Sequence, residues 1–135
     1  MDAFDADVLI YAAAPAHPLG RKVAMLFADA DELRVGSTLL LPELLSKPVR
    51  TRNERELARL AGLLARIELR PLDVATADLA TALGAMYGLR APDAVHLATA
   101  VAAGADRFVT NNRRDFPASI AEIDVVFPDA LPEPS

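Results

Sequence analysis

The chain has 135 residues, of which 53% are hydrophobic and 5% aromatic, and its formal net charge at pH 7 is −5. This length and hydrophobicity predict one folded domain and exclude an intrinsically disordered protein. The sequence contains no cysteine, which excludes disulfides and thiolate metal sites. Any metal ligand must therefore be an oxygen or one of the two histidines, His17 and His96.

The sequence contains no sign of a membrane segment or a secretion signal. No apolar run approaches the ~18 residues that a membrane-spanning helix needs. The first residues include Asp2, Asp5 and Asp7, and no basic residue occurs before Arg21, whereas a signal peptide begins with a basic region. We therefore expect a cytoplasmic protein with no membrane partner.

Charge is unevenly distributed along the chain. Residues 47–70 contain seven basic and three acidic residues, a net +4, which leaves −9 for the rest. The overall negative charge argues against tight non-specific binding of nucleic acid. A basic flank beside an acidic body could steer an anionic polymer, but a solvated helix face with Glu–Arg pairs explains the pattern equally well.

The first part of the chain alternates short strands with helices. Residues 2–5 are a candidate strand, and Asp7 is a candidate cap for the helix DVLIYAAA that follows. Prolines and a glycine predict a loop or kinked helix over residues 12–20. An amphipathic helix is expected over 21–29, and residues 33–35 form the second candidate strand.

The middle of the chain repeats this alternation. Proline is tolerated in a first helical turn, so we expect a helix that begins near Leu40, has Glu43 close to its start and ends at Pro48. Residues 53–67 are the clearest amphipathic helix. A third strand, 69–72, contains a proline and is expected at a sheet edge.

A further pair of helices precedes the fourth strand. The first starts at Asp73 or Thr76 and ends at Gly88. The second has Pro92 and Asp93 in its first turn, where a missing N–H costs little and a negative charge suits the helix dipole. The sequence RFVT after this helix predicts a short buried strand, followed by a polar turn.

The complete pattern predicts an α/β fold. Residues 123–127 form a last candidate strand, so the order is β-α-α-β-α-α-β-α-α-β-β. Strands separated by helices indicate a mostly parallel sheet of four to five strands flanked by helices. We expect one domain over residues 1–127 and a loose, Pro-rich C-terminal tail over 128–135.

Acidic residues recur where such a sheet binds ligands. Asp5 ends the first strand, Glu43 begins the helix after the second, Asp93 begins the helix before the fourth, and Asp115 follows the fourth strand. The carboxyl ends of parallel strands share one edge, so these groups can converge. Clustered carboxylates favour a hard cation such as Mg²⁺, which suits phosphoryl transfer. Each acid could equally be an ordinary helix-start residue, because 19 of the 135 residues are acidic.

Four motifs together resemble a known family. FDADVLIYA, PELLSKPVR, PDAVHLATA and FVTNNRRDF occur in an order and spacing similar to those of PIN-domain ribonucleases. The resemblance is greatest to the VapC-like toxins of type II toxin–antitoxin pairs and covers about residues 2–127. It implies a PIN-like domain that cleaves RNA with Mg²⁺ or Mn²⁺ and metal-activated water. It also implies a homodimer that is held inactive by a small antitoxin protein.

The resemblance assigns roles to three acids. Asp5, Glu43 and Asp93 correspond to the first, second and third acids of the family, and Asp5 and Asp93 are the expected direct metal ligands. Asp7 stands where the family more often has Ser, Thr or Asn, and a capping role explains it without function.

The fourth position departs from the commonest family pattern. Thr110 corresponds to a hydroxyl residue near the site, but Asn112 stands where many members have an acid. Toxin-branch members often read Thr-x-Asn-x-x-Asp-Phe, so we assign the fourth acidic role to Asp115 and treat Asn112 as a neutral ligand or substrate contact. For His96 we favour a hydrogen-bonded structural role over a substrate contact.

Two alternative functions fit parts of the sequence. FDADVL also resembles the nucleophile motif of haloacid-dehalogenase-type phosphatases, with Asp5 as nucleophile and Asp7 as acid/base. Those enzymes need a later lysine, and the only lysines here are Lys22 and Lys47. A PIN-like module that has lost activity and only binds a partner is the more serious alternative, although three intact acids argue against it.

Overall fold

The computed structural model describes residues 1–14, 16–117 and 119–133. Its strands form one sheet in the order β3-β2-β1-β4-β5, and all neighbouring strands run parallel. The prediction of a mostly parallel sheet is therefore confirmed, as is the edge position of the third strand. The strands are β1 (Asp2–Phe4), β2 (Arg34–Ser37), β3 (Glu68–Arg70), β4 (Arg107–Val109) and β5 (Asp124–Val126).

Pairs of helices connect the first four strands, in the predicted order. Within the described residues the α-helices are α1 (Ala6–Ala12), α2 (Pro18–Ala24), α3 (Leu40–Arg50), α4 (Glu54–Leu64), α5 (Val74–Tyr87) and α6 (Ala91–Ala102). Two short 3-10 helices, η1 (Met25–Phe27) and η2 (Pro128–Ala130), follow α2 and β5. None of the described helices is long and apolar enough to cross a membrane.

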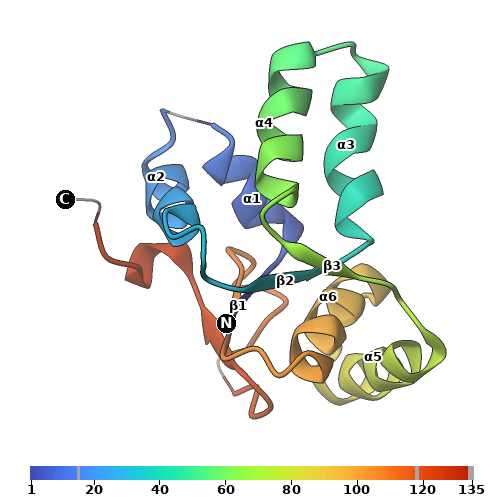
Figure 1. Ribbon diagram of the computed structural model, residues 1–135. Coiled ribbons are helices and arrows are strands. Elements are labelled where there is room, and N and C mark those ends of the chain that lie inside the picture. The colour runs from blue at the N-terminus through green and yellow to red at the C-terminus, as the bar shows by residue number, and fades with distance from the viewer. Residues whose placement is uncertain (15, 118, 134–135) are drawn as a thin grey trace.

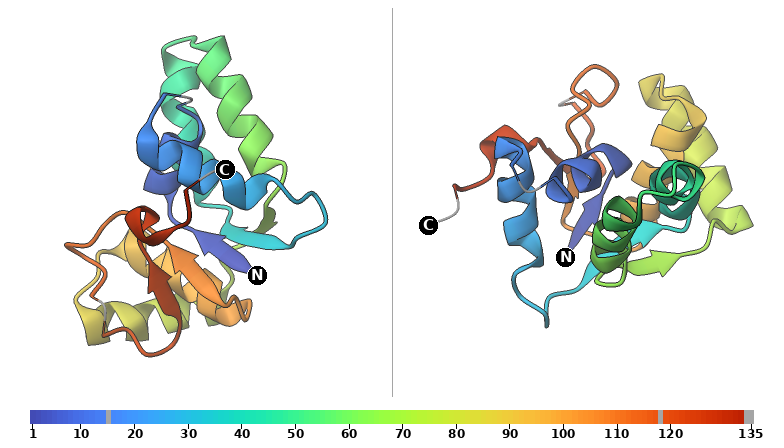
Figure 2. Two further views of the ribbon diagram at one scale, coloured as in Figure 1. Left: turned by 90° about the vertical axis from the view of Figure 1, so that its left-hand side faces the viewer. Right: turned by 90° about the horizontal axis from the view of Figure 1, so that it is seen from above.

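The sheet is covered on both faces, and α5 and α6 lie on the face opposite α1 to α4 (Figures 1 and 2). Successive strand residues point to opposite faces, so neighbours in β1 and β4 belong to different cores. Ala3 and Phe108 pack in the core with α5 and α6, whereas Phe4 and Val109 pack with α1 to α4. This alternation fixes the register and hence the residues that lie just beyond each strand.

The helices α3 and α4 form a hairpin that projects from the body of the molecule (Figure 1). Pro48 was expected to end α3, but the helix continues to Arg50. A proline removes one helical hydrogen bond, and pairing resumes beyond it because Thr51 N donates to Lys47 O at 2.9 Å. Asn53 then caps α4 by accepting from Glu56 N at 3.1 Å.

Two other helix predictions were inaccurate at their ends. The helix expected over 21–29 begins earlier, at Pro18, because the ring of His17 accepts a hydrogen bond from Leu19 N at 3.1 Å. The helix expected over 53–67 ends at Leu64, although Ile67 is still buried in the core. Residue 15, in the predicted loop, lies outside the described residues.

The C-terminal segment is not loose where the structure describes it. Leu131 is only 4% exposed and packs in the same core as Phe4. Asp129 forms an ion pair with Arg113, and Glu133 lies 3.1 Å from Lys22 Nζ. Composition suggested a tail, but one apolar anchor and flanking charges hold this segment in place. Residues 134 and 135 lie outside the described range, and the domain boundary at 127 stays a prediction.

Candidate active site

The ends of β1 and β4 bring two predicted site residues into contact. Phe4 pairs with Val109, and the next residues are Asp5 and Thr110. Thr110 Oγ1 donates to Asp5 Oδ2 at 2.8 Å, and both residues are buried, with exposures of 0% and 6%. Asp5 Oδ1 caps α1 by accepting from Ala6 N at 2.8 Å. Both carboxylate oxygens are therefore fixed in orientation.

Asp93 lies in the first turn of α6 and faces the other acids. Burial, followed by the negative charges of Asp5 and Asp115, raises the pKa of Asp93 from 3.8 to about 6. Glu43 adds a smaller effect in the same direction. The structure thus brings the four acids of the sequence-based prediction to one edge of the sheet, with Asp93 near the other three.

Glu43 is held by a histidine of α6. It lies in the first turn of α3, and its Oε1 contacts Nε2 of the buried His96. Among the described residues, Nδ1 of His96 has no hydrogen-bond partner. This environment favours the tautomer that carries its proton on Nε2 and donates it to Glu43. His96 is therefore a buried, hydrogen-bonded histidine, as we favoured, and its partner is a candidate site residue.

A short network also holds Asp115. Asn112 N donates to Thr110 Oγ1 at 3.1 Å, and Asn112 Nδ2 donates to Asp115 Oδ2 at 2.9 Å. In return, Asp115 N lies 3.3 Å from the accepting Asn112 Oδ1. The backbone N–H of Asn112 thus binds the hydroxyl beside Asp5, while its side-chain amide binds the fourth acid. This geometry supports separate roles for Asn112 and Asp115.

The structure adds Asp7, which we had interpreted as a helix cap. The strand ends at Phe4 rather than at residue 5, so Asp5 is the cap and Asp7 occupies the first helical turn. Asp7 Oδ2 accepts from Asn111 N at 3.1 Å. Burial, followed by the charge of Asp5, raises the pKa of Asp7 to about 7. If the first strand had been predicted to end at Phe4, the sequence would have assigned Asp5 as the cap of α1 and Asp7 to its first turn.

Comparison with known proteins decides the family. The sequence matches the PIN domain profile over residues 3–121. The chain belongs to the PIN domain family. PIN domains are nucleases, so this membership removes the phosphatase alternative and confirms the predicted resemblance. No curated protein sequence matches the chain.

Solved toxin–antitoxin structures share this PIN fold over nearly their whole length. A toxin–antitoxin complex from Klebsiella pneumoniae has a TM-score of 0.76 and 23% identity, and the match covers 95% of this chain and 98% of that one. DNA-bound VapBC from Salmonella typhimurium gives 0.74 and 22%, with coverages of 94% and 97%. FitAB bound to a DNA fragment gives 0.67 and 20%, with coverages of 98% and 99%. At these identities the similarity shows the fold.

The donor atoms at this PIN-domain edge suit a hard divalent cation. Asp5, Asp7, Glu43, Asp93 and Asp115 offer carboxylate oxygens, which Mg²⁺ prefers. Within the described residues, no three Asp, Glu or His side chains are already grouped to hold an ion. Mg²⁺ commonly keeps several waters and binds one or two carboxylates, so a complete protein cage is not required. Burial first, and the neighbouring carboxylates second, raise the pKa values of Asp7 and Asp93, and a bound cation would offset both effects.

Proposed function

We propose that this PIN domain is a Mg²⁺- or Mn²⁺-dependent endoribonuclease and the toxin of a toxin–antitoxin pair. The observation that carries the proposal is the gathering of acids at the carboxyl edge of the sheet, where Asp5 follows β1 beside Thr110 and Glu43 contacts His96, one helical turn from Asp93. An acidic edge of this kind repels a phosphodiester unless a cation is present. The same edge therefore calls for a metal before it can accept an RNA backbone.

Asp5 and Asp93 would hold the cation directly. The cation would neutralise the scissile phosphate and lower the pKa of a bound water. Thr110 and the first turn of α1 fix Asp5, so one ligand is oriented in advance. Asp93 is only partly buried and is free of such bonds among the described contacts, so it can adjust to the ion.

Two further acids would handle protons. Glu43, which contacts His96, and Asp115, which accepts a hydrogen bond from Asn112, would orient the attacking water and accept its proton. The water oxygen forms a bond to phosphorus while the bond to the 3′ oxygen breaks, and that oxygen takes up a proton. The products are a 5′-phosphate and a 3′-hydroxyl.

The structural neighbours support the proposed antitoxin partner. Those neighbours are toxins in complex with antitoxins, and some complexes contain DNA. By this similarity we propose that a small antitoxin protein inactivates the chain, and from the sequence and its family resemblance we propose a cytoplasmic homodimer. Co-expression with the product of the adjacent reading frame, followed by co-purification, would test the pairing.

Substitution of the two proposed metal ligands tests the nuclease. Asp5→Asn and Asp93→Asn should each reduce Mg²⁺-dependent RNA cleavage by roughly 10³-fold, because several kcal/mol of charge stabilisation are lost. Asn remains a good helix cap, so Asp5→Asn should keep the fold. The control is Asp78→Asn, which removes an exposed acid on α5. Near-parent cleavage by either ligand variant would refute the assignment, and an inactive parent protein would favour the binding-module alternative.

A further inference from the structure

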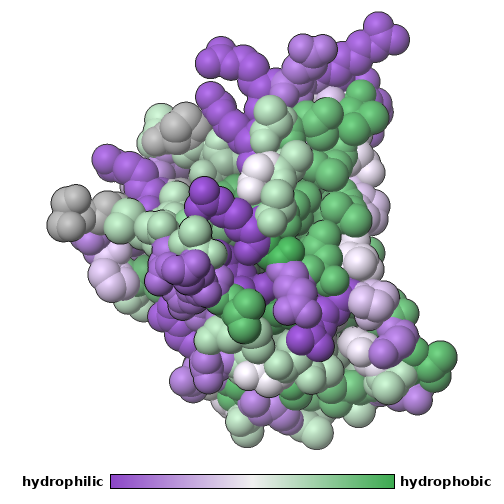
Figure 3. Space-filling view, viewed as in Figure 1, coloured by the Kyte–Doolittle hydropathy of each residue, from purple (hydrophilic) through white to green (hydrophobic). Residues whose placement is uncertain are grey.

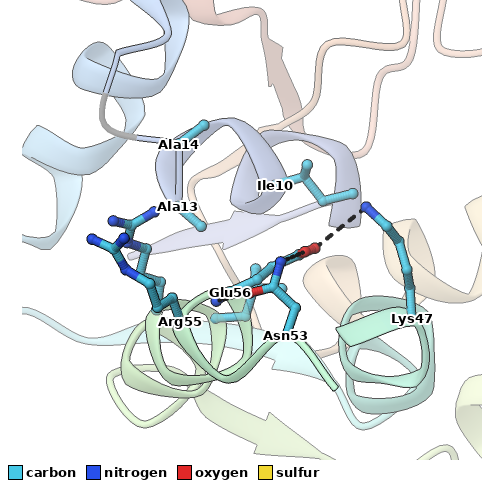
Figure 4. Close-up of a pocket in the computed structure, with 9 residues that line it drawn as sticks. Ile10, Ala13, Ala14, Lys47, Asn53, Arg55 and Glu56 are labelled. Carbon is cyan, nitrogen blue, oxygen red and sulfur yellow. Dashed lines mark hydrogen bonds and ion pairs between the residues drawn. The ribbon is translucent and has the colours of Figure 1, made fainter. Parts of the chain in front are cut away.

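A cleft of about 410 Å³ lies between α1 and the α3–α4 hairpin (Figure 4). Ile10 and Ala13 of α1 form an apolar wall. The opposite wall carries Lys47, Arg55 and Arg59, and we call these three residues the basic cleft. Figure 4 shows Lys47 at one end of this hairpin wall and Arg55 at the other. The cleft is therefore apolar along one wall and cationic along the other.

The positive charge of the basic cleft is poorly neutralised. Glu56 is the acid in the cleft, where Asn53 Nδ2 donates to it at 3.2 Å and Lys47 Nζ lies 3.6 Å away. Within the described residues, neither Arg55 nor Arg59 forms an ion pair, and both are exposed. Hydrophilic side chains also gather at the free end of the hairpin (Figure 3). The alternative explanation of this basic segment was a solvated helix face with Glu–Arg ion pairs. Neither of these two arginines forms such a pair among the described residues.

The basic cleft begins one helical turn from the candidate active site. Lys47 follows Glu43 by four residues on α3, so the two residues lie on the same helix face, with their Cβ atoms about 6 Å apart. On the facing wall, α1 starts directly after Asp5, and Ile10 and Ala13 lie further along it and at its C-terminal end. Helices α1 and α3 therefore both extend from the acids to the cleft, and they line its two facing walls.

We propose that the basic cleft binds the phosphate backbone of single-stranded RNA next to the scissile bond. Lys47 would contact the phosphate nearest the acids, and Arg55 and Arg59 the phosphates beyond it. Guanidinium groups bind phosphate oxygens through paired N–H donors, and lysine acts as a point charge. A positively charged groove that follows the backbone is a common feature of proteins that bind single-stranded nucleic acids. This inference rests on the proposed nuclease function and assigns the path of its substrate.

Binding of a fluorescent single-stranded RNA oligonucleotide, measured by anisotropy in EDTA across a salt series, tests the cleft without cleavage. Arg55→Gln/Arg59→Gln should weaken binding at least about tenfold and reduce the salt slope by about 1.4, since each lost single-strand phosphate contact removes ~0.7. The matched control is Arg50→Gln/Arg52→Asn, which removes the same charge from the same hairpin outside the cleft lining. Asparagine suits position 52 because its φ is 54°. The control should stay within about threefold of the parent.

Two results would overturn the proposal. Equal losses in both double variants would show that only the general charge of the hairpin matters. If the cleft variant binds RNA like the parent, the cleft does not contact the RNA, and a protein partner would be its occupant instead. Thermal melting of each variant verifies folding. Cleavage of RNA by the parent protein separates the two claims. If the parent does not cleave RNA with Mg²⁺ or Mn²⁺, the proposed nuclease function fails, whereas if the parent cleaves and the cleft variant binds RNA normally, the cleft assignment alone fails.

Discussion

Neighbouring side chains orient the acids of the candidate site at the scale of single residues. Thr110 holds Asp5, and Asn112 holds Asp115, each at hydrogen-bond distance. Asp93 instead has no such hydrogen bond among the described contacts, and burial, followed by the charges of Asp5 and Asp115, raises its pKa to about 6. The acids are thus partly oriented in advance, and their mutual repulsion would favour binding of the proposed cation.

The contact between His96 and Glu43 gives a test at this scale. His96→Leu removes the N–H donor and fills the buried helix position with an apolar side chain. We expect cleavage to fall by roughly 10–100-fold. His96→Gln retains an N–H and should recover part of the rate. Single-turnover cleavage with saturating RNA measures the effect, and thermal melting controls for stability. Parent-like cleavage by the leucine variant would show that His96 serves packing alone.

The sequence predicted the acids of this site but not the contacts between them. Asp5, Glu43 and Asp93 could be proposed because strand ends and helix starts share one edge of a parallel sheet. The contact of Glu43 with His96 spans 53 positions and depends on the side-chain conformations of two helices. Asp7 was misread because a strand end placed one residue too far changed which aspartate caps α1.

At the scale of elements, the strand–helix order followed from the sequence, whereas several ends did not. Hydrophobic periodicity and Gly88 located α5, whose cap has a φ of 67°. Pro48 did not end α3, because later N–H groups still found helical partners. The segment around Leu131 was read as a tail, because a single buried apolar residue is invisible to composition. Tertiary packing therefore decided what local signals left open.

Two glycines give opposite predictions that test these helix assignments. Gly62 lies inside α4 with open space around it, so Gly62→Ala should stabilise the protein by about 0.5–1 kcal/mol. Gly88 also has open space, but its φ of 67° strains any side chain, so Gly88→Ala should destabilise by about 1–2 kcal/mol. Thermal or urea unfolding measures both. The same sign for both variants would contradict these backbone conformations.

The whole molecule separates its charges. The carboxylates gather at the sheet edge, and the α3–α4 hairpin carries cations just beyond it. In the proposed function, the hairpin would attract an RNA strand and the acidic edge would repel it, and a divalent cation would relieve this repulsion by neutralising the edge. The central claim is therefore that Asp93 belongs to a cation site rather than to an ordinary helix start.

The melting temperature of Asp93→Asn, measured at low salt with and without Mg²⁺ or Mn²⁺, tests this claim most directly. The raised pKa means that the folded state keeps a proton that the unfolded chain loses, so the carboxyl weakens the fold as the pH rises from about 4 to about 6. Above this interval the metal-free variant should melt a few degrees higher than the parent, roughly 3–6 °C for ~1 kcal/mol. It should also lose most of the stabilisation that the cation gives the parent. A lower metal-free melting temperature together with an unchanged cation-induced shift would contradict the account, since that is the behaviour of a helix-start aspartate.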